Sequence, residues 1–160
     1  DPAVLDAASP GARCADGSIY AGTSGGHRLY TTAADQGQFT WHNGTSNWTE
    51  TGATSTSDGL ANTNTLVALA DAGAPYKAAH ACRALGSEWY LPSRDELNVL
   101  YVNRVAIGGF DLSGSFPAGW YWSSSEYYHV YARTQRFSDG NPNHTLRTDG
   151  LSIRCVRRAN

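Results

Sequence analysis

Two helix-forming segments lie near the middle of the chain with strand-like segments on both sides, and this order constrains the possible folds more than any other feature. The helices are expected at about 75–85 and 93–105. The strand-like segments, which lie between turn signals, are 18–22, 27–32, 121–125, 131–138, 144–148 and 151–157. Strands, two helices and strands again predict an α+β domain with antiparallel sheets and long loops.

Both helices carry signals at their ends. Pro75 suits the first turn of the first helix and Gly86 suits its end, and the apolar spacing between them should bury Cys82. The second helix opens at Ser93 with Glu96 three residues later. This pair is a capping box, in which each side chain accepts a hydrogen bond from the backbone N–H of the other residue.

Length and composition indicate one folded domain. The chain has 160 residues, of which 41% are hydrophobic and 16% charged, a profile that excludes a disordered protein. We assign residues 1–13 to an N-terminal tail or linker and 14–160 to the domain, in which the Thr-, Ser- and Asn-rich stretch 43–65 is expected to be a surface loop. No apolar run approaches the roughly 20 residues that cross a bilayer, and the net charge of -2 gives no footprint for nucleic acid. We therefore expect a soluble domain without a nucleic-acid partner or membrane insertion.

The three cysteines, Cys14, Cys82 and Cys155, bear on the compartment of the protein. Their number is odd and their spacing contains no CxxC or CxxH, which argues against zinc and allows one disulfide plus one thiol. Disulfides persist in oxidising compartments. We therefore favour an exported protein over one whose cysteines are reduced structural thiols.

Signatures of catalysis are missing from the sequence. It contains no GxSxG, P-loop, GxGxxG after a strand, HExxH or EF-hand loop, and its five histidines do not cluster. The carboxylates Asp95 and Glu96 fall in the first turn of the second helix, where the helix dipole and the capping box account for them. We therefore expect no enzymatic activity, no cofactor and no metal.

The segment 120–153 has the composition of a binding surface. Six aromatic residues fall within its first twelve positions, and small polar residues then alternate with Arg, His and Asn. Tyr and Trp give large contact areas at low entropic cost, while Ser, Asn and Gly give adaptable hydrogen bonds. We expect Trp120 and Trp122 in the core and the later aromatic residues partly in solvent. Residues 127–160 also hold six Arg against two Asp, so this surface should be positive.

Several short motifs lie in the second half of the chain. They are Trp89-Tyr-Leu-Pro-Ser-Arg-Asp-Glu-Leu97, Tyr121-Trp-Ser-Ser-Ser-Glu126, Ala132, Phe137, Gly140 and Arg154-Cys-Val-Arg157. Together they resemble the bacterial domain family found at the C-terminus of collagen-like adhesins, which has a C-type-lectin-like fold. The resemblance covers about 76–158. It implies a disulfide between Cys82 on the first helix and Cys155 on the last strand, which leaves Cys14 over.

Residues 127–153 contain no Lys, Glu, Met or Trp and a single Gln, Gln135. This composition resembles the randomised segment of the variable proteins of diversity-generating retroelements, many of which carry this domain, and it implies a diversifiable binding face. Calcium-dependent sugar-binding lectins carry Glu-Pro-Asn or Gln-Pro-Asp together with Trp-Asn-Asp. This chain has Trp122-Ser-Ser and Asn141-Pro142-Asn143 instead, so calcium-dependent sugar binding is not expected.

These features predict a binding module that is secreted or displayed on a bacterial envelope, pilus or virion, with a protein or carbohydrate ligand on a cell or host surface. The side chains expected to face the ligand are Tyr127, Tyr128, His129, Tyr131, Arg133, Arg136, Asn141, Asn143, His144, Arg147 and Asp149. One alternative is a non-variable adhesin whose Arg-rich face binds sulfated polysaccharide. Another, from a different class, is an oxidoreductase of the formylglycine-generating kind.

Overall fold

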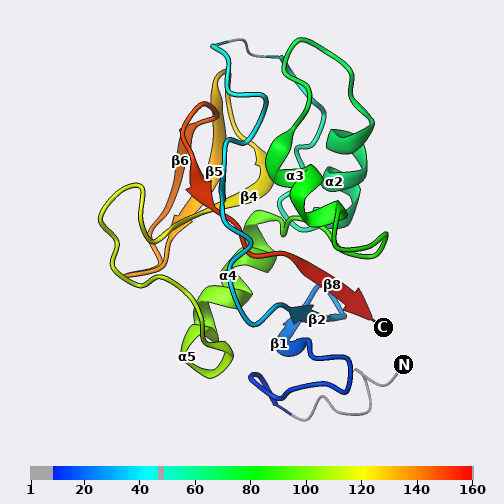
Figure 1. The fold of residues 1–160 in the computed structure, drawn as a ribbon, viewed down its shortest axis with the longest axis vertical. Helices are drawn as coiled ribbons and strands as arrows, with labels where there is room; N and C mark the ends of the chain where they lie inside the picture. Colours follow the sequence, from blue (N-terminus) through cyan, green and yellow to red (C-terminus); the bar gives the residue numbers. More distant parts are fainter. Residues whose placement is uncertain (1–8, 47–48, 160) are drawn as a thin grey trace.

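The chain folds as a mixed α+β domain with two sheets and helices packed around them (Figure 1). The computed structural model describes residues 9–46 and 49–159, so residues 1–8 of the expected tail lie outside the described residues. The strands are β1 Ile19–Ser24, β2 His27–Thr31, β3 Gln38–Phe39, β4 Trp120–Glu126, β5 Tyr131–Arg136, β6 Pro142–Leu146, β7 Leu151–Ser152 and β8 Val156–Ala159. The helices are α2 Gly59–Ala68, α3 Lys77–Arg83, α4 Arg94–Val102 and α5 Arg104–Ile107. None of the helices in the described part of the chain is long and apolar enough to cross a membrane.

The two sheets differ in strand direction. The smaller sheet has the order β1-β2-β8 and is antiparallel, and the larger has the order β3-β7-β4-β5-β6. In the larger sheet β4 and β7 run parallel, with Tyr121 opposite Ser152, so the expectation of antiparallel pairing is wrong at this pair. The physical reason is that β5 already pairs with one edge of β4. β7 therefore pairs with the other edge, which it reaches running in the same direction as β4.

Residues 11–13 of the expected tail are attached to the smaller sheet. The backbone N–H of Gly11 donates to the carbonyl of Tyr20 at 2.8 Å, and the N–H of Tyr20 donates to the carbonyl of Ala12 at 2.9 Å. These hydrogen bonds extend the pairing of β1 by one short segment.

The predicted strand 151–157 is two short strands in different sheets. β7 belongs to the larger sheet and β8 to the smaller, and residues 153–155 cross between them. Arg154 was expected on a face opposite the apolar residues, but it is fully buried, where it pairs with Asp35 at 2.9 Å. Its Nη1 also donates to the carbonyls of Thr32 and Gly108. Both faces of the crossing segment are thus covered, because it passes between the sheets.

The first predicted helix is present but shorter. α3 begins at Lys77, because Tyr76 is its N-cap residue and Pro75 lies before the helix. It ends at Arg83, and Cys82 is buried as expected.

The second predicted helix begins where the sequence indicated. The Ser93 hydroxyl accepts from the Glu96 N–H at 3.3 Å, and the Glu96 carboxylate accepts from the Ser93 N–H at 3.0 Å, which confirms the capping box. α4 ends at Val102, earlier than expected, because the backbone of Asn103 leaves the helical conformation before α5 starts.

Part of the expected surface loop 43–65 is helical. α2 begins after Asp58, whose carboxylate accepts from the Ala61 N–H at 3.0 Å. Thr and Asn are weak helix formers, so composition alone indicated a loop. Tertiary contacts override that preference, since the buried side chain of Asn62 donates to the Ser55 carbonyl at 2.7 Å. The buried positions recur at helical spacing and are Gly59, Asn62, Thr63 and Leu66.

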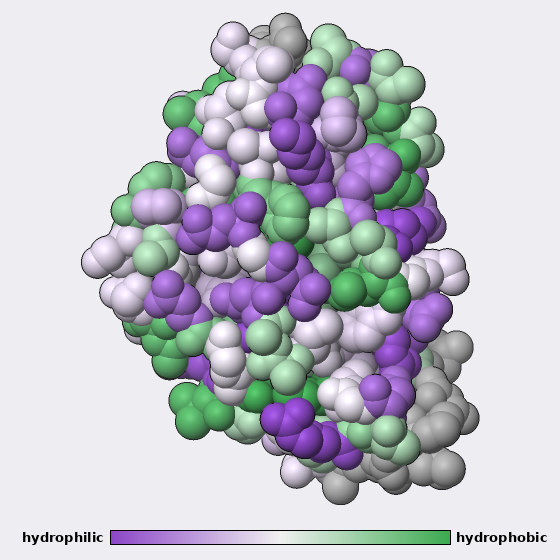
Figure 2. All heavy atoms as spheres, viewed as in Figure 1, coloured by the Kyte–Doolittle hydropathy of each residue, from purple (hydrophilic) through white to green (hydrophobic). Residues whose placement is uncertain are grey.

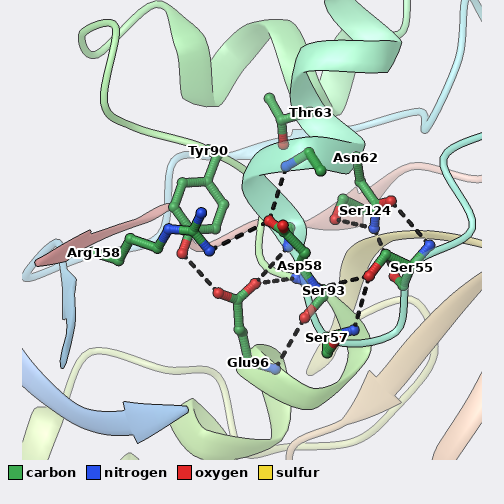
Figure 3. Close-up of polar contacts among 12 residues, drawn as sticks. Ser55, Ser57, Asp58, Asn62, Thr63, Tyr90, Ser93, Glu96, Ser124 and Arg158 are labelled. Atoms are coloured by element: carbon green, nitrogen blue, oxygen red, sulfur yellow. Dashed lines mark hydrogen bonds and ion pairs between the residues drawn. The ribbon is translucent and has the colours of Figure 1, made fainter. Parts of the chain in front are cut away.

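A buried carboxylate, Glu96, joins α4 to the start of α2 (Figure 3). Its Oε1 accepts from the backbone N–H of Gly59 at 2.9 Å and of Ser93 at 3.0 Å, and its Oε2 accepts from the Tyr90 hydroxyl at 2.7 Å. Burial and the neighbouring Glu96 charge raise the pKa of Tyr90, which therefore stays a donor. The approach is close, because a Cβ atom at Gly59 would lie 2.5 Å from Glu96 Oε1.

The disulfide that the family resemblance implied, Cys82–Cys155, is present. It lies in the larger of the core clusters, which also contains Trp120 and Trp122 and so confirms the expectation for these two residues. Cys14 is buried and takes part in no disulfide within the described residues. The crosslink therefore ties α3 directly to the segment that passes between the sheets.

Reduction of this disulfide should destabilise the domain. The two cysteines are 73 residues apart, and closing such a loop contributes about 4 kcal/mol, or roughly 8–16 °C in melting temperature for a domain of this size. Calorimetry with and without dithiothreitol measures the shift. The control is the double variant Cys82→Ala/Cys155→Ala, whose melting temperature should not respond to the reductant. An unchanged melting temperature of the unaltered chain after reduction would contradict this role.

Replacement of Glu96 should cost far more stability than replacement of its neighbour. Glu96→Ala leaves three donors without an acceptor, so the free energy of unfolding should fall by about 3 kcal/mol or more. Asp95 lies in the same helical turn and forms an exposed ion pair with Arg94, so Asp95→Ala should cost under about 1 kcal/mol. Urea denaturation at pH 7 measures both. Equal losses in the two variants would show that Glu96 does not join the helices.

Candidate ligand-binding face

The β4–β5 connection carries the exposed tyrosines at one end of the larger sheet. Tyr127 and Tyr128 follow β4 directly and are 43% and 62% exposed. His129 continues the turn with a φ of 48°, a left-handed conformation that is uncommon outside glycine. The turn therefore presents these three side chains to solvent, as expected from their spacing.

Four side chains from this region form one group, which we call the aromatic cluster: Tyr127, Tyr131, Arg133 and His144. The rings of Tyr127 and His144 stack with their centroids 4.3 Å apart, and Tyr131 meets His144 edge-on at 5.0 Å. The Arg133 guanidinium carbon lies 4.9 Å from the centre of the Tyr127 ring. These contacts order side chains that stay partly exposed, so less entropy is lost when a ligand binds.

Strand alternation separates this cluster from the core. Arg133 on β5 pairs with His144 on β6, the edge strand of the larger sheet (Figure 1). Successive side chains of a strand point to opposite faces, and the residue before Arg133 on β5, Ala132, packs in the core with Trp122. The cluster thus occupies the face of the hairpin that the core does not use.

Arg147 was expected to face a ligand, but its side chain is buried at the base of the hollow that Tyr127, Tyr128 and His129 line. Its side chain is 1% exposed and pairs with Glu126 at 3.0 Å. It also donates to the carbonyl of Thr49 at 3.0 Å and to that of Tyr131 at 3.2 Å, and its guanidinium lies over the Trp41 ring. The physical reason for its inward orientation is this set of buried acceptors, which sequence spacing cannot reveal.

The Arg147–Glu126 pair fixes the base of the exposed turn. Glu126 is the last residue of β4, and its Oε1 also accepts from the backbone N–H of Thr51 at 2.7 Å. Burial lowers the pKa of the Arg147 guanidinium, and the Glu126 charge opposes that shift. The pair thereby joins the end of β4 to the residue after β6. Its hydrogen bonds to Thr49 and Thr51 attach a third segment to both.

Arg136 and Asn141 lie at the other end of the β5–β6 hairpin from the aromatic cluster. Arg136 pairs with Asp139 at 2.5 Å and holds the pKa of that carboxyl at about 2. The exposed Asn141 donates its backbone N–H to Asp139 at 3.0 Å. The predicted ligand-binding residues therefore do not form one continuous face. Arg136 and Asn141 lie at the turn end of the β5–β6 hairpin, away from the aromatic cluster.

The remaining predicted residues are also placed. Asn143 is exposed on β6 beside His144. Asp149 is half-buried in the turn before β7, where its backbone N–H donates to the Leu146 carbonyl at 3.0 Å. Asn143 lines the same hollow as Tyr127, Arg133 and His144, whereas Asp149 belongs to a separate turn.

A groove between α4 and the β5–β6 hairpin brings in residues that sequence reasoning missed. Arg94 and Asn98 of α4 line it together with Gln135 of β5. The Asn98 Oδ1 accepts from the Gln135 Nε2 at 2.9 Å. Helical periodicity could have grouped Arg94 with Asn98, since they lie one turn apart on α4. Only tertiary structure places that side of the helix next to β5.

The side chains of this region determine which contacts it can make. Among the described residues, no group of three or more His, Cys, Asp or Glu side chains could hold a metal ion. The face offers aromatic rings, guanidinium donors and side-chain amides. Such groups bind by stacking, ion pairing and hydrogen bonding. On the side of the molecule that Figure 2 shows, hydrophilic and hydrophobic residues are mixed.

Removal of the buried negative charge should destabilise the base of the turn. Glu126→Gln leaves Arg147 buried without its counter-ion, and such a change costs about 3–5 kcal/mol. The control is Asp139→Asn, which removes one partner of the solvent-exposed Arg136–Asp139 pair and should change stability little. Urea denaturation measures both variants. If Glu126→Gln unfolds no more readily than Asp139→Asn, the buried pair does not hold the turn.

Comparison with known proteins adds no assignment to this geometry. No protein-family model matches the chain, and no curated protein matches it either. The function inferred below therefore rests on the chemistry and placement of the chain's own residues.

Proposed function

We propose that this protein is an exported ligand-binding module with a C-type-lectin-like fold, and that its ligand is a protein or carbohydrate on a cell or host surface. The binding face consists of the aromatic cluster, the two exposed residues of the β4–β5 turn and the neighbouring Asn on β6. These residues are Tyr127, Tyr128, His129, Tyr131, Arg133, Asn143 and His144.

The observation that carries this proposal is the stack of Tyr127 on His144 at a solvent-exposed site. Burying large aromatic rings stabilises a fold, so exposed rings that are nonetheless ordered do not serve the core. Rings of this kind supply contact area to a partner at low entropic cost, and binding surfaces are enriched in Tyr and Arg for this reason.

The scaffold below the face supports an exchangeable surface. The disulfide, the Glu96 hydrogen bonds and the Arg147–Glu126 pair are all buried, and none of them uses a side chain of the face. Exposed positions on such a scaffold tolerate substitution, since changes away from buried networks alter stability little. This arrangement supports our proposal that the exposed positions within residues 127–153 vary among copies of the protein, as in the variable proteins of diversity-generating retroelements.

The disulfide also supports the proposed location. Disulfides form and persist outside reducing compartments, and Cys82–Cys155 is buried in the core. We therefore place the module outside the cell or on its surface.

A quadruple variant tests the proposal. Tyr127, Tyr128, Asn143 and His144 are each replaced by Ser, which should shift the melting temperature by no more than a few degrees because all four side chains are exposed. Binding of the labelled chain to a printed array of glycans and purified cell-surface proteins should be lost.

The matched control is the double variant Leu85→Ser/Val105→Ser, which alters exposed apolar residues away from the face and should leave array binding unchanged. Equal array binding by the quadruple variant and the unaltered chain, or no array binding by the unaltered chain, would refute the proposed function. A collapse of the fold in the quadruple variant would refute the exchangeable surface.

A further inference from the structure

The groove between α4 and the β5–β6 hairpin continues from the aromatic cluster along the helix. Two adjoining hollows of about 320 and 350 Å³ form it, and both are lined by Arg94 and Pro142. The first hollow is bounded by Asn98 and Gln135, and the second by Tyr127, Arg133 and His144.

Two arginines and one carboxylate, Arg94, Arg133 and Asp95, line the groove, so its net charge is positive. Arg133 has no ion-pair partner among the described residues, and its buried Nε donates to no acceptor there. Arg94 uses its Nε and Nη2 on Asp95, which leaves its Nη1 without a partner in the described part of the chain. Buried donors in native proteins are nearly always satisfied, so the Arg133 Nε is open to an acceptor that enters the groove, whether water or a group of a ligand.

The backbone at the start of α4 does not contribute to this charge. The N–H of Arg94 donates to the Ser125 hydroxyl, that of Asp95 to the Thr56 carbonyl and that of Glu96 to the Ser93 hydroxyl. All three of these helix-terminal donors are taken by the protein itself. The two guanidinium groups are therefore the anion-binding elements of the groove.

The floor of the groove offers a neighbouring donor and acceptor. The hydrogen bond from Gln135 Nε2 to Asn98 Oδ1 leaves the Asn98 amide nitrogen and the Gln135 carbonyl oxygen without partners among the described residues. A donor beside an acceptor matches the adjacent hydroxyl groups of a sugar, each of which both donates and accepts. An acidic peptide would also meet this amide pair through its backbone N–H and C=O groups. The stacked rings of Tyr127 and His144 favour the sugar, because an aromatic ring packs against the apolar face of a sugar ring.

We infer that the groove binds an acidic sugar, with its carboxylate or sulfate on Arg133 and Arg94, its hydroxyl groups on Asn98 and Gln135, and its ring against the stacked Tyr127 and His144. This inference rests on the proposed binding function and names the ligand chemistry and the subsite. It adds Arg94, Asn98 and Gln135 to the face.

Isothermal titration with defined tetrasaccharides tests the inference. The probes are a sulfated heparin tetrasaccharide, an unsulfated hyaluronan tetrasaccharide with carboxylates only, neutral chitotetraose and a tetra-glutamate peptide. At least one acidic sugar should bind, with an affinity that falls as salt screens the arginines, and chitotetraose should bind at least tenfold more weakly. Binding of only one acidic sugar supports the inference and identifies its anionic group.

Arg133→Gln should weaken binding of that sugar at least tenfold. The control is Arg104→Gln on α5, because Arg104 also lies over a tyrosine ring, that of Tyr101, at 4.0 Å but is remote from the groove. This variant should bind as the unaltered chain does. Circular dichroism melts of both variants show whether either has lost its fold.

Binding of neither acidic sugar, tighter binding of tetra-glutamate, or full affinity in Arg133→Gln would each overturn the inference. The proposed function has a separate readout. If the quadruple Ser variant loses binding to the array while Arg133→Gln keeps it, the binding module stands and the groove is not its acidic-sugar site.

Discussion

The Cys82–Cys155 disulfide fixes the point at which the chain leaves one sheet and enters the other, and the remaining packing depends on this point. Ile153 exchanges backbone hydrogen bonds with the loop at Gln36 and Gly37, and the Thr31 hydroxyl donates to the Cys155 carbonyl at 2.7 Å. Two distant parts of the chain, residues 31–37 and α3, therefore meet at Ile153 and Cys155. A crosslink here acts on both sheets and on α3 together.

Buried charges take the place of regular pairing in the long loops. Glu96, Arg147 and Arg154 are each buried, and each has backbone partners in other segments of the chain. Burial raises the pKa of the Asp35 carboxyl and lowers that of its partner Arg154, whose side chain is fully buried. Their hydrogen bonds to other segments offset the cost of burial and fix the loop positions, although the buried Arg154 Nη2 has no acceptor among the described residues.

Neighbouring residues of β5 contribute separately to the core and to the exposed cluster. Ala132 packs into the core, whereas Arg133 joins an ordered but exposed cluster on the opposite face. The buried Arg147–Glu126 pair holds the adjoining turn without using any exposed side chain of the cluster. The surface can therefore change its chemistry while the body keeps its fold, which is the property that a variable binding module needs.

The sequence by itself determined the α+β class, the capping box at Ser93, the burial of Trp122 and the exposure of Tyr127, because these follow from local spacing and residue type. The disulfide followed from a family resemblance. Tertiary structure alone decided that Thr- and Asn-rich residues form α2, that the last strand divides, that Arg147 turns inward and that Arg94 meets Arg133 across a groove. In each of these cases the deciding partners are distant in the chain, and no local pattern encodes a contact between distant segments.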